Sequence, residues 1–519
     1  MIIESFSSQG NFSLSPGDGQ IGLAFTDSKL MRTAGYPMEN IKSSLCITTL
    51  FVFLICVPVR ASRIGKQILE DLAIENTSSI LNNLLPSSEQ GIANGIQFDL
   101  IRKESLNNSQ ASIISPTDPF SRLLERLRKS KARVESLKKI VTIATGESSN
   151  GSNVYHELDW RSPVSSALSL GDDEYLIRLG VGTPAVNQYY LAIDTGSDIT
   201  WLQCAGCSKC YSQRGPLFNP ASSSSYQTIS CESSTCRQMD ESRCQSDRCQ
   251  YAVTYGDGSF TTGDLAMDTL SSENGALKNM VFGCGHDNEG LFQGIDGLAG
   301  LGGGYLSFTS QLAGSYGRRF SYCLVNQNSP LSSSSSLIFG ADAFPSAAVT
   351  TPLIYNSRIP TFYYASVTGI SINGVALNID VSKLQLTSSG SGGLIIDSGT
   401  TLTYLESSVY SALTDGFLKS AKNLRRAGGV QDLDTCFDLS GTDSSSAIPT
   451  ISFHFQGGVT VDLPSSNILI EVDNKGIYCL AFSDSDFGMS IFGNVQQQTF
   501  RIGFDRDNKL LSFSSSQCK

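Results

Sequence analysis

The chain has 519 residues, a hydrophobic fraction of 40%, 48 glycines and a net charge of -11. This length exceeds one typical domain, and the composition fits a folded, turn-rich protein rather than a disordered one. Residues 1–160 hold 16 Lys and Arg and 16 Asp and Glu. The totals of 37 and 48 therefore leave 21 basic and 32 acidic residues for the rest of the chain. Such an acidic body argues against nucleic acid or an anionic membrane as a partner.

The first predicted element is a secretory signal peptide. Its apolar stretch, residues 45–59, is about 15 residues long and too short for a comfortable membrane span. Lys42 precedes the stretch, and Val59-Arg60-Ala61 follows it as a small-residue cleavage site. We expect translation to start at Met38, with residues 1–37 as a gene-model extension and residues 38–61 as the signal peptide. A signal anchor held in the membrane is the alternative.

Residues 62–165 form a predicted propeptide. They contain no cysteine, and they carry three glycosylation sequons, which begin at Asn76, Asn107 and Asn150. Residues 121–140 hold eight Lys and Arg against two Asp and Glu. An apolar stripe at helical spacing runs through this basic stretch and consists of Leu123, Leu127, Val134, Leu137 and Val141.

We expect this stretch to form a basic helix that lies on the acidic body and covers its cleft. Acid would protonate the carboxylates that attract the helix and thereby release it. A solvated helix in a linker is the alternative.

Beyond residue 170, short β-type runs alternate with turns rich in Gly, Ser and Asn. The clearest runs are residues 175–181, 189–193, 250–255, 362–372, 451–455 and 500–504. Residues 408–422 are the best helical segment, with Val409, Leu413, Phe417 and Leu418 on one face. The pattern predicts an all-β body, mainly strands with few short helices.

Two strings of one pattern, Asp194-Thr195-Gly196-Ser197 and Asp397-Ser398-Gly399-Thr400, each follow an apolar run. An aspartate at the end of a buried strand, followed by a hydroxyl residue and a glycine, fits a tight loop whose amides and hydroxyls reach the carboxylate. Two facing loops would hold their carboxyls in contact, and such a pair shares one proton because like charges that close cannot both ionise. The pair would activate a water for amide hydrolysis, and we expect neither a metal nor a cofactor.

Further strings accompany the two motifs. Residues 253–260 predict a β-hairpin that carries Tyr255, and Trp201 follows the first motif closely. An apolar–apolar–Gly string follows each aspartate, as Leu298-Ala299-Gly300 and as Ile491-Phe492-Gly493. This order is a weak internal repeat, which predicts two similar β lobes with a cleft between them and a boundary near Thr350.

With these strings in order over nearly all of residues 170–518, the chain resembles the pepsin-like aspartic protease family. Within this family, the chain is similar to the plant nepenthesin-type group. The segments that carry this similarity are the Cys-rich segment, Phe282-Gly283-Cys284-Gly285, residues 393–400 and residues 491–498. The resemblance implies a bilobal acid protease fold. Its N-terminal catalytic lobe would be residues 166–349, with a Cys-rich insert at 204–249, and its C-terminal catalytic lobe would be residues 350–519.

The resemblance implies that Asp194 and Asp397 are the catalytic pair. The supporting residues of the two loops would be Thr195, Gly196, Ser197, Ser398, Gly399 and Thr400. Among these, Ser197 and Thr400 would donate hydrogen bonds to the outer carboxylate oxygens, while Thr195 and Ser398 would join the loops from behind. A flap over the substrate would contain Tyr255, Gly256 and Asp257, with the Trp201 indole donating to the Tyr255 phenol.

Of the 14 cysteines, Cys46 and Cys56 lie in the signal segment, and the even number left in the body is compatible with the disulfides of a secreted protein. Cys204, Cys207 and Cys210 stand at a spacing that zinc ligands also use, but no histidine lies near them. The cysteine positions alone leave the connectivity open. The resemblance implies the pairs Cys204–Cys207, Cys210–Cys284, Cys231–Cys249, Cys236–Cys244, Cys323–Cys518 and Cys436–Cys479.

The function predicted from the sequence is a secreted aspartic-type endopeptidase, made as a zymogen and active at acidic pH on peptides or proteins. We expect it in the apoplast or cell wall, or in a vacuole. Its partners would be its substrate and its own propeptide; we expect no nucleic acid, no membrane in the mature form, and a monomer. The rival is a catalytically silent protein-binding or inhibitor-like member of the same fold, and the intact motif pair argues against it.

Overall fold

The computed structural model describes residues 45–49, 53–57, 95–102, 119–145 and 175–515, the last range with gaps at 186, 240–241, 256–258, 273–274, 291, 293, 327–334, 346–347, 432, 442–447 and 487. Several predictions lie outside the described residues: the extension 1–37, the signal cleavage site, the three sequons, Gly256, Asp257 and Cys518. The chain divides into two compact units, Met1–Gln90 and Gly91–Lys519. In the first unit, β1 (Leu45–Thr49) pairs antiparallel with β2 (Phe53–Val57).

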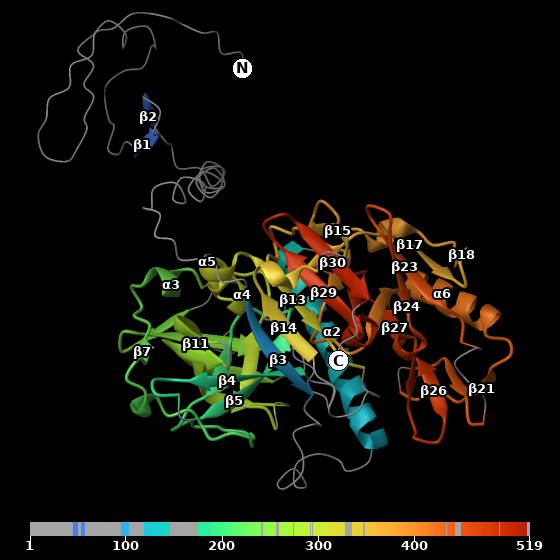
Figure 1. Cartoon of the computed structure of the whole chain (residues 1–519), viewed down its shortest axis with the longest axis horizontal. Coiled ribbons are helices and arrows are strands. Elements are labelled where there is room, and N and C mark those ends of the chain that lie inside the picture. Colours follow the sequence, from blue (N-terminus) through green and yellow to red (C-terminus); the bar gives the residue numbers. More distant parts are fainter. Residues whose placement is uncertain are drawn as a thin grey trace, which may run out of the picture. The chain divides into compact units, whose positions relative to one another are not determined.

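Strands dominate the second unit, which confirms the all-β prediction (Figure 1). One antiparallel sheet joins its two halves, in the order β4–β3–β14–β13–β29–β30–β15. The bounds of these strands are β3 Ile96–Arg102, β4 Tyr175–Val181, β13 Arg319–Cys323, β14 Ser335–Phe339, β15 Val349–Ile354, β29 Phe500–Asp505 and β30 Leu510–Ser515.

Strand β3 lies inside the predicted propeptide, well before the basic helix predicted there at residues 121–140. Ile96, Phe98 and Leu100 are buried, whereas the alternating Gln97 and Asp99 are exposed. This alternation is the two-residue period of a strand with one face in the core. The propeptide prediction therefore covers a segment that belongs to the central sheet.

The N-terminal lobe is built around the parallel pairing of β5 with β12 and of β6 with β11. Three consecutive antiparallel strands, β9, β10 and β11, complete the lobe. Its strands are β5 Gln188–Asp194, β6 Trp201–Gln203, β7 Gln227–Thr228, β8 Arg243–Gln245, β9 Arg248–Thr254, β10 Phe260–Ser272, β11 Gly275–Glu289 and β12 Gly297–Gly300. Its short helices are η4 Pro220–Ser222, α3 Ser234–Arg237, α4 Phe308–Gln311, α5 Ala313–Tyr316 and η5 Ala341–Ala343.

The C-terminal lobe repeats this plan with the parallel pairs β19–β28 and β20–β27. Two four-stranded sheets, β18–β17–β23–β24 and β21–β22–β26–β25, flank them. The strands are β16 Tyr364–Ala365, β17 Val367–Ile372, β18 Val375–Ala376, β19 Leu394–Ile396, β20 Thr403–Glu406, β21 Arg425–Ala427, β22 Cys436–Asp438, β23 Ile451–Phe455, β24 Val459–Leu463, β25 Leu469–Glu471, β26 Ile477–Leu480, β27 Phe482–Ser485 and β28 Ser490–Phe492. The helices are η6 Val381–Leu384, α6 Ser407–Ser420, η8 Ser465–Asn467 and α7 Asn494–Gln497.

Helix α6 is the helix predicted at 408–422, and its apolar face packs into the core as expected. Val409, Leu413 and Phe417 are fully buried. The helix begins one residue early because the Glu406 side chain caps it, accepting hydrogen bonds from the backbone N–H groups of the first turn.

The core is continuous between the lobes. Phe504 of β29 stacks on Phe320 of β13 at 4.7 Å between ring centroids, and it also contacts Tyr363 at 4.5 Å. Rings from both halves of the chain therefore fix how the two lobes meet. Among the described residues, no helix has both the length and the apolar character needed to span a membrane.

Candidate active site

Each predicted aspartate motif begins where a buried strand ends beside a parallel partner. Asp194, at the end of β5, lies opposite Gly300 of β12. Ile396, just before Asp397, lies opposite Phe492 of β28. The two apolar–apolar–Gly strings are therefore the partner strands of the two aspartate strands, which explains why they recur.

The glycine that ends each string is required by close backbone approach. A Cβ added to Gly300 would lie 2.4 Å from the backbone of Asp198. A Cβ added to Gly493 would lie 2.1 Å from the carbonyl oxygen of Leu402. Real Cβ atoms do not approach other heavy atoms this closely, so both positions exclude larger residues.

The two carboxyl groups are held in matching ways. Both are fully buried. Oδ1 of Asp194 accepts a hydrogen bond from the Gly196 N–H at 3.0 Å, and Oδ1 of Asp397 accepts one from the Gly399 N–H at 3.0 Å. Thr400 donates its hydroxyl to Asp397 Oδ2 at 2.5 Å, in the role that the resemblance implies.

Ser197 differs from this expectation. Ser197 lies beside Asp194 and lowers the pKa of its carboxyl, but neither Ser197 Oγ nor Asp194 Oδ2 makes a hydrogen bond of normal geometry among the described residues. The bonded oxygen of Asp194 is Oδ1, which takes both Gly196 and a further donor, Arg133. The symmetry of the two motifs is therefore broken at the outer oxygen of the first aspartate.

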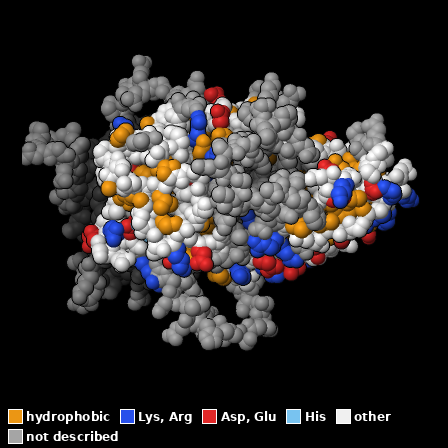
Figure 2. All heavy atoms as spheres, turned by 90° about the horizontal axis from the view of Figure 1, so that it is seen from below, with side chains coloured by type: hydrophobic (Ala, Val, Ile, Leu, Met, Phe, Trp, Pro, Cys, Tyr) orange, Lys and Arg blue, Asp and Glu red, His pale blue; other side chains and the backbone are white. Residues whose placement is uncertain are grey.

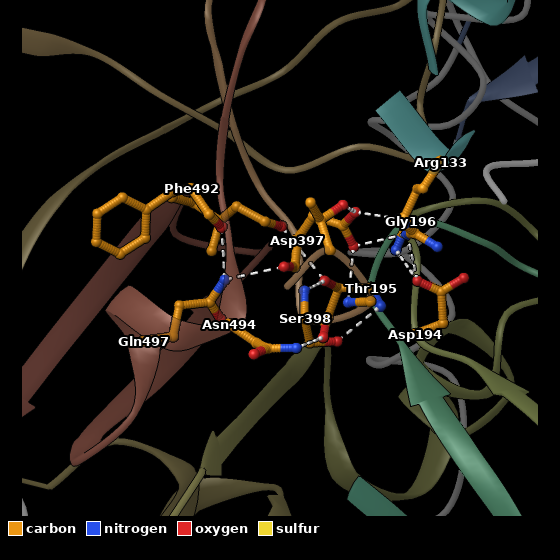
Figure 3. A network of polar contacts seen from close by, with 12 residues as sticks. Arg133, Asp194, Thr195, Gly196, Asp397, Ser398, Phe492, Asn494 and Gln497 are labelled. Carbon is orange, nitrogen blue, oxygen red and sulfur yellow. Dashed lines mark hydrogen bonds and ion pairs between the residues drawn. The ribbon is translucent and has the colours of Figure 1, made fainter. Parts of the chain in front are cut away.

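Thr195 and Ser398 join the two loops behind the carboxyls (Figure 3). The Thr195 N–H donates to Ser398 Oγ at 3.2 Å, and the Ser398 N–H donates to Thr195 Oγ1 at 2.9 Å. Thr195 Oγ1 donates in turn to the carbonyl of Ile396 at 3.3 Å. This reciprocal arrangement fixes the distance between the motifs and needs a hydroxyl on both sides.

The predicted hairpin forms from β9 and β10, which pair with Thr254 opposite Phe260. At its end, Tyr255 is buried, and its phenolic oxygen accepts a hydrogen bond from Trp201 Nε1 at 2.6 Å. The Phe292 ring packs against both aromatic rings, at 4.9 Å from Trp201 and 5.3 Å from Tyr255. Gly256 and Asp257, the other predicted flap residues, lie outside the described residues.

Arg133 is a site residue that the sequence analysis missed. It belongs to helix α2 (Pro119–Thr145) and is fully buried. Its Nη2 lies 2.7 Å from Oδ1 of Asp194 and 2.7 Å from Oδ1 of Asp397, and its Nε lies 2.6 Å from Oδ2 of Asp397 (Figure 3). One guanidinium thus occupies the space between the two carboxylates and bonds both of them.

The charges in this cluster stabilise one another. Burial lowers the pKa of Arg133, but the negative charges of Asp194 and Asp397 outweigh it and raise that pKa above the ordinary arginine value. The pKa of Asp194 lies above its usual value: burial raises it most, the neighbouring Asp397 raises it further, and Arg133 partly offsets both. Without the guanidinium, the two carboxyls face each other as like charges and share a proton.

Helix α2 docks mainly through its apolar stripe. All five predicted stripe residues are buried, in a cluster with residues of the C-terminal lobe that includes Ile359, Phe362 and Leu433. The signal that could have revealed Arg133 is its place on this face, one helical turn before Leu137.

A surface ion pair also joins α2 to the body. The pair between Lys138 and Asp486 is 3.3 Å long and largely exposed, and such pairs contribute at most about 1 kcal/mol. On the face shown in Figure 2, basic and acidic side chains are interspersed rather than gathered into one field.

The disulfide pairing corrects the one implied by the resemblance. The structure contains Cys204–Cys284, Cys207–Cys210, Cys231–Cys244, Cys236–Cys249 and Cys436–Cys479. Only the last matches, and the predicted partner of Cys323 lies outside the described residues. Cys204 pairs with Cys284 because β6 runs parallel to β11, which puts the Cys204 N–H 3.0 Å from the carbonyl of Gly285.

These pairings also answer the zinc alternative, since Cys204, Cys207 and Cys210 are all disulfide-bonded. Within the part of the chain that the structure describes, no group of three or more His, Cys, Asp or Glu side chains is placed to hold a metal ion.

The arrangement supports water-mediated hydrolysis. Nη2 of Arg133 marks a point 2.7 Å from one oxygen of each carboxyl, which is hydrogen-bond distance for a water in its place. A water there would contact both carboxyls, so one could accept its proton while the other donates a proton to a carbonyl.

The chain is similar to known aspartic proteases. The family descriptions "Xylanase inhibitor N-terminal" and "Xylanase inhibitor C-terminal" match residues 175–341 and 362–515. The chain is 42% identical to "Protein ASPARTIC PROTEASE IN GUARD CELL 2" of Arabidopsis thaliana, over 76% of this chain and 83% of that protein. It is 41% identical to "Aspartic proteinase nepenthesin-1" of Nepenthes gracilis, over 70% of this chain and 82% of that protein.

Solved structures share the fold. The "Crystal structure of edgp" superposes with a TM-score of 0.56 at 23% identity, covering 67% of this chain and 92% of that one. Basic 7S globulin from soybean superposes with a TM-score of 0.53 at 21% identity, covering 66% of this chain and 94% of that one. At such identities the likeness shows the fold alone, and it confirms the predicted bilobal architecture.

Proposed function

The chain belongs to the pepsin-like aspartic protease family, and we propose that it is made as an inactive precursor. Arg133 of helix α2 blocks the site of this precursor, and acid activates it. It is an aspartic-type endopeptidase that acts on peptides or proteins. The contact between Arg133 and the aspartate pair is the observation that carries the proposal, because a carbonyl and a water cannot enter a site filled by a guanidinium.

In the active form, the ionised member of the Asp194 and Asp397 pair takes a proton from a water held between them. The protonated member polarises the scissile carbonyl and later supplies a proton to the leaving amine. The hydroxyl of Thr400 and the N–H groups of Gly196 and Gly399 hold the carboxylates during both steps.

The acid dependence follows from linkage. Arg133 donates hydrogen bonds to both carboxyls and so favours their ionised form, although burial keeps the pKa of Asp194 above its usual value. After release the two carboxyls face each other as like charges and share a proton, so the docked state binds fewer protons than the released state. Docking therefore weakens as the pH falls and the pair takes up protons. A protonated pair also leaves the buried Arg133 charge without its partners, which is strongly unfavourable.

We propose that the enzyme is secreted and works as a monomer in the apoplast or in a vacuole. Secretion is supported by disulfides in both lobes, such as Cys204–Cys284 and Cys436–Cys479, because disulfides persist in oxidising compartments. An acidic compartment also suits a body with excess carboxylates.

The test compares precursors that carry R133Q or R128Q. Both changes remove one positive charge from α2, but Arg128 is exposed whereas Arg133 is buried between the carboxyls. Removing one partner of a buried ion pair costs about 3–5 kcal/mol. We therefore expect R133Q to process itself and cleave a peptide at pH 7, where wild type and R128Q stay inactive.

Equal behaviour of the two variants at pH 7 would contradict the block by Arg133. A precursor that releases α2 at pH 4 yet never cleaves a peptide would instead favour the inhibitor-like alternative. A D194N version of each precursor controls for a contaminating protease, because its own pair cannot act.

A further inference from the structure

Three consecutive glutamines, Gln496, Gln497 and Gln498, follow the string Ile491-Phe492-Gly493, and all three are buried. A buried amide is rarely left without hydrogen-bond partners, since it has lost its contacts with water. Gln496 and Gln497 each make three hydrogen bonds, whereas Nε2 of Gln498 has none among the described residues. The enzymatic mechanism described above assigns none of them a task.

Gln497 uses both of its amide donors and its carbonyl oxygen. Its Nε2 donates to the backbone carbonyl of Asp397 at 3.1 Å and to that of Phe492 at 2.7 Å (Figure 3). Its Oε1 accepts the hydroxyl of Tyr322 at 2.5 Å. One side chain thus connects the backbone of a catalytic aspartate, the partner strand β28 and strand β13 of the central sheet.

The bridge lies at the point where the backbone ladder between β19 and β28 ends. The last pair of that ladder is Ile396 with Phe492, and the Asp397 N–H still donates to the Phe492 carbonyl at 3.2 Å. Beyond this point the chain turns into the catalytic loop. There the side-chain amide of Gln497 donates to the carbonyls of both Asp397 and Phe492 and so connects the two segments just beyond their last backbone pair.

The first motif shows why the second needs such a bridge. In the N-terminal lobe, the Asp194 carbonyl accepts the backbone N–H of Leu301, the residue after the apolar–apolar–Gly string, at 2.7 Å. The corresponding residue of the C-terminal lobe is Asn494, and its N–H donates to Thr400 instead, at 2.7 Å. The carbonyl of Asp397 thus accepts a hydrogen bond from a side chain, whereas the carbonyl of Asp194 accepts the equivalent bond from a backbone N–H.

Tyr322 holds Gln497 in its orientation. The phenol is fully buried, and burial together with the nearby charge of Asp397 raises its pKa well above the usual tyrosine value. It therefore stays a neutral donor throughout the working range of an acid protease. Because Oε1 is fixed as the acceptor of this bond, the two N–H donors of Gln497 must face the Asp397 and Phe492 carbonyls.

We infer that Gln497 is a positioning residue for peptide hydrolysis. It fixes the peptide unit of Asp397 and thereby the angle at which the Asp397 carboxyl meets that of Asp194. Tyr322 in turn orients Gln497. Neither side chain contacts the reacting atoms. Their effect is exerted through the backbone from which the Asp397 carboxyl projects.

The neighbouring Gln496 provides a matched control. It is equally buried and also makes three hydrogen bonds: Nε2 donates to the carbonyls of Asn467 at 2.8 Å and Ala481 at 3.0 Å, and Oε1 accepts the hydroxyl of Thr403 at 2.7 Å. None of these partners belongs to a catalytic motif. Q496L and Q497L therefore remove the same chemical group from sites of the same burial.

The experiment uses the full chain, assayed on a peptide under the conditions in which wild type is active, with thermal unfolding measured in parallel. We expect both variants to lose stability to a similar degree. Only Q497L should lose kcat, roughly 10- to 100-fold, because a misplacement on the order of 1 Å costs about 100-fold in rate. KM should stay within about 3-fold, and the pH limits of kcat/KM should shift, since the shared proton depends on the geometry of the pair.

Two further variants keep the proposal testable where Q497L fails to fold. Y322F leaves the Gln497 donors in place but frees their orientation, and we expect a smaller fall in kcat with unchanged KM. Q497E retains a donor only while protonated, so its activity should approach wild type at low pH and fall more steeply than wild type as the pH rises. Equal loss of kcat in Q496L and Q497L, or wild-type kcat and pH profile in Y322F and Q497E, would overturn the assignment.

Discussion

The indole Nε1 of Trp201 donates a hydrogen bond to the phenolic oxygen of Tyr255 at 2.6 Å, across 54 positions of sequence. Trp201 lies in β6 and is fully buried, so the donor is immobile. The bond holds the first residue of the predicted flap at a fixed place relative to the strands of the N-terminal lobe.

Replacing Trp201 by Phe should weaken catalysis through this contact. W201F keeps an aromatic ring against Phe292 but removes the donor, so the buried Tyr255 hydroxyl loses this hydrogen bond. We expect a fall in kcat/KM of about 10-fold, in line with about 1.4 kcal/mol for one buried hydrogen bond. Y255F, which removes the acceptor instead, should not add to the loss when combined with W201F; additive losses would contradict the coupling.

D194N and D397N should each abolish peptide cleavage, by roughly 10³-fold or more, because each leaves the site without one member of the acid–base pair. Both substitutions keep the size of the side chain, so the fold should persist. Initial rates on a synthetic peptide measure the loss, and thermal unfolding provides the control. A variant that retained the full rate would refute the assignment of its aspartate.

Asp296 should make the folded state less stable as the pH rises. Its carboxyl accepts N–H groups of Tyr190 at 2.8 Å and Gly215 at 2.7 Å, yet burial raises its pKa to about 6. The unfolded value is about 3.9, so the folded protein holds the proton more tightly. This contribution is fully present at low pH and is lost as the pH rises from about 4 to about 6.

The loss amounts to at most about 3 kcal/mol, since a tenfold change in proton affinity corresponds to about 1.4 kcal/mol. D296N should therefore flatten the fall in unfolding free energy between pH 4 and pH 6, as measured by urea unfolding at a series of pH values. An unchanged slope would show that another group is responsible.

The corrected disulfide pairing predicts unequal effects of two double variants. Cys204 and Cys284 are 80 positions apart, whereas Cys207 and Cys210 are 3 apart. In the chain-entropy model, a disulfide contributes about 4–5 kcal/mol for the longer loop and about 2 kcal/mol for the shorter one. C204S/C284S should lower the melting temperature much more than C207S/C210S.

Peptide mapping of the unreduced protein gives an independent check of the same pairing. A peptide that joins Cys204 to Cys207, as the family resemblance implied, would contradict the structure.

Local signals account for what the sequence predicted well. The loops at Asp194 and Asp397 are each encoded within a few residues, as a buried strand that runs into a hydroxyl and a glycine. The recurrence of Leu298-Ala299-Gly300 as Ile491-Phe492-Gly493 revealed the two-lobed plan, because each string is the strand paired with its aspartate.

The errors concern contacts that no local pattern encodes. In the sequence, Arg133 is one of eight basic residues of a predicted helix, and only its position on the apolar face indicates that it is buried. The pairing of Cys204 with Cys284 depends on the parallel contact of β6 with β11, which joins distant segments. The sequence places Gln497 in a string typical of the family but does not indicate its role, because its partners lie on three separate strands or loops.

Strand β3 has a consequence for how a shorter, active chain could arise. It pairs with β4 along one edge and with β14 along the other, so it is an interior strand although it precedes α2 in the chain. A cut between α2 and β4 leaves the helix covalently joined to β3, so removing α2 while residues 96–102 stay hydrogen-bonded in the sheet takes a second cut between β3 and α2. A mature enzyme then either keeps this short fragment as a second chain or fills its place with another strand. Without a strand there, the facing backbone groups of β4 and β14 would be unpaired.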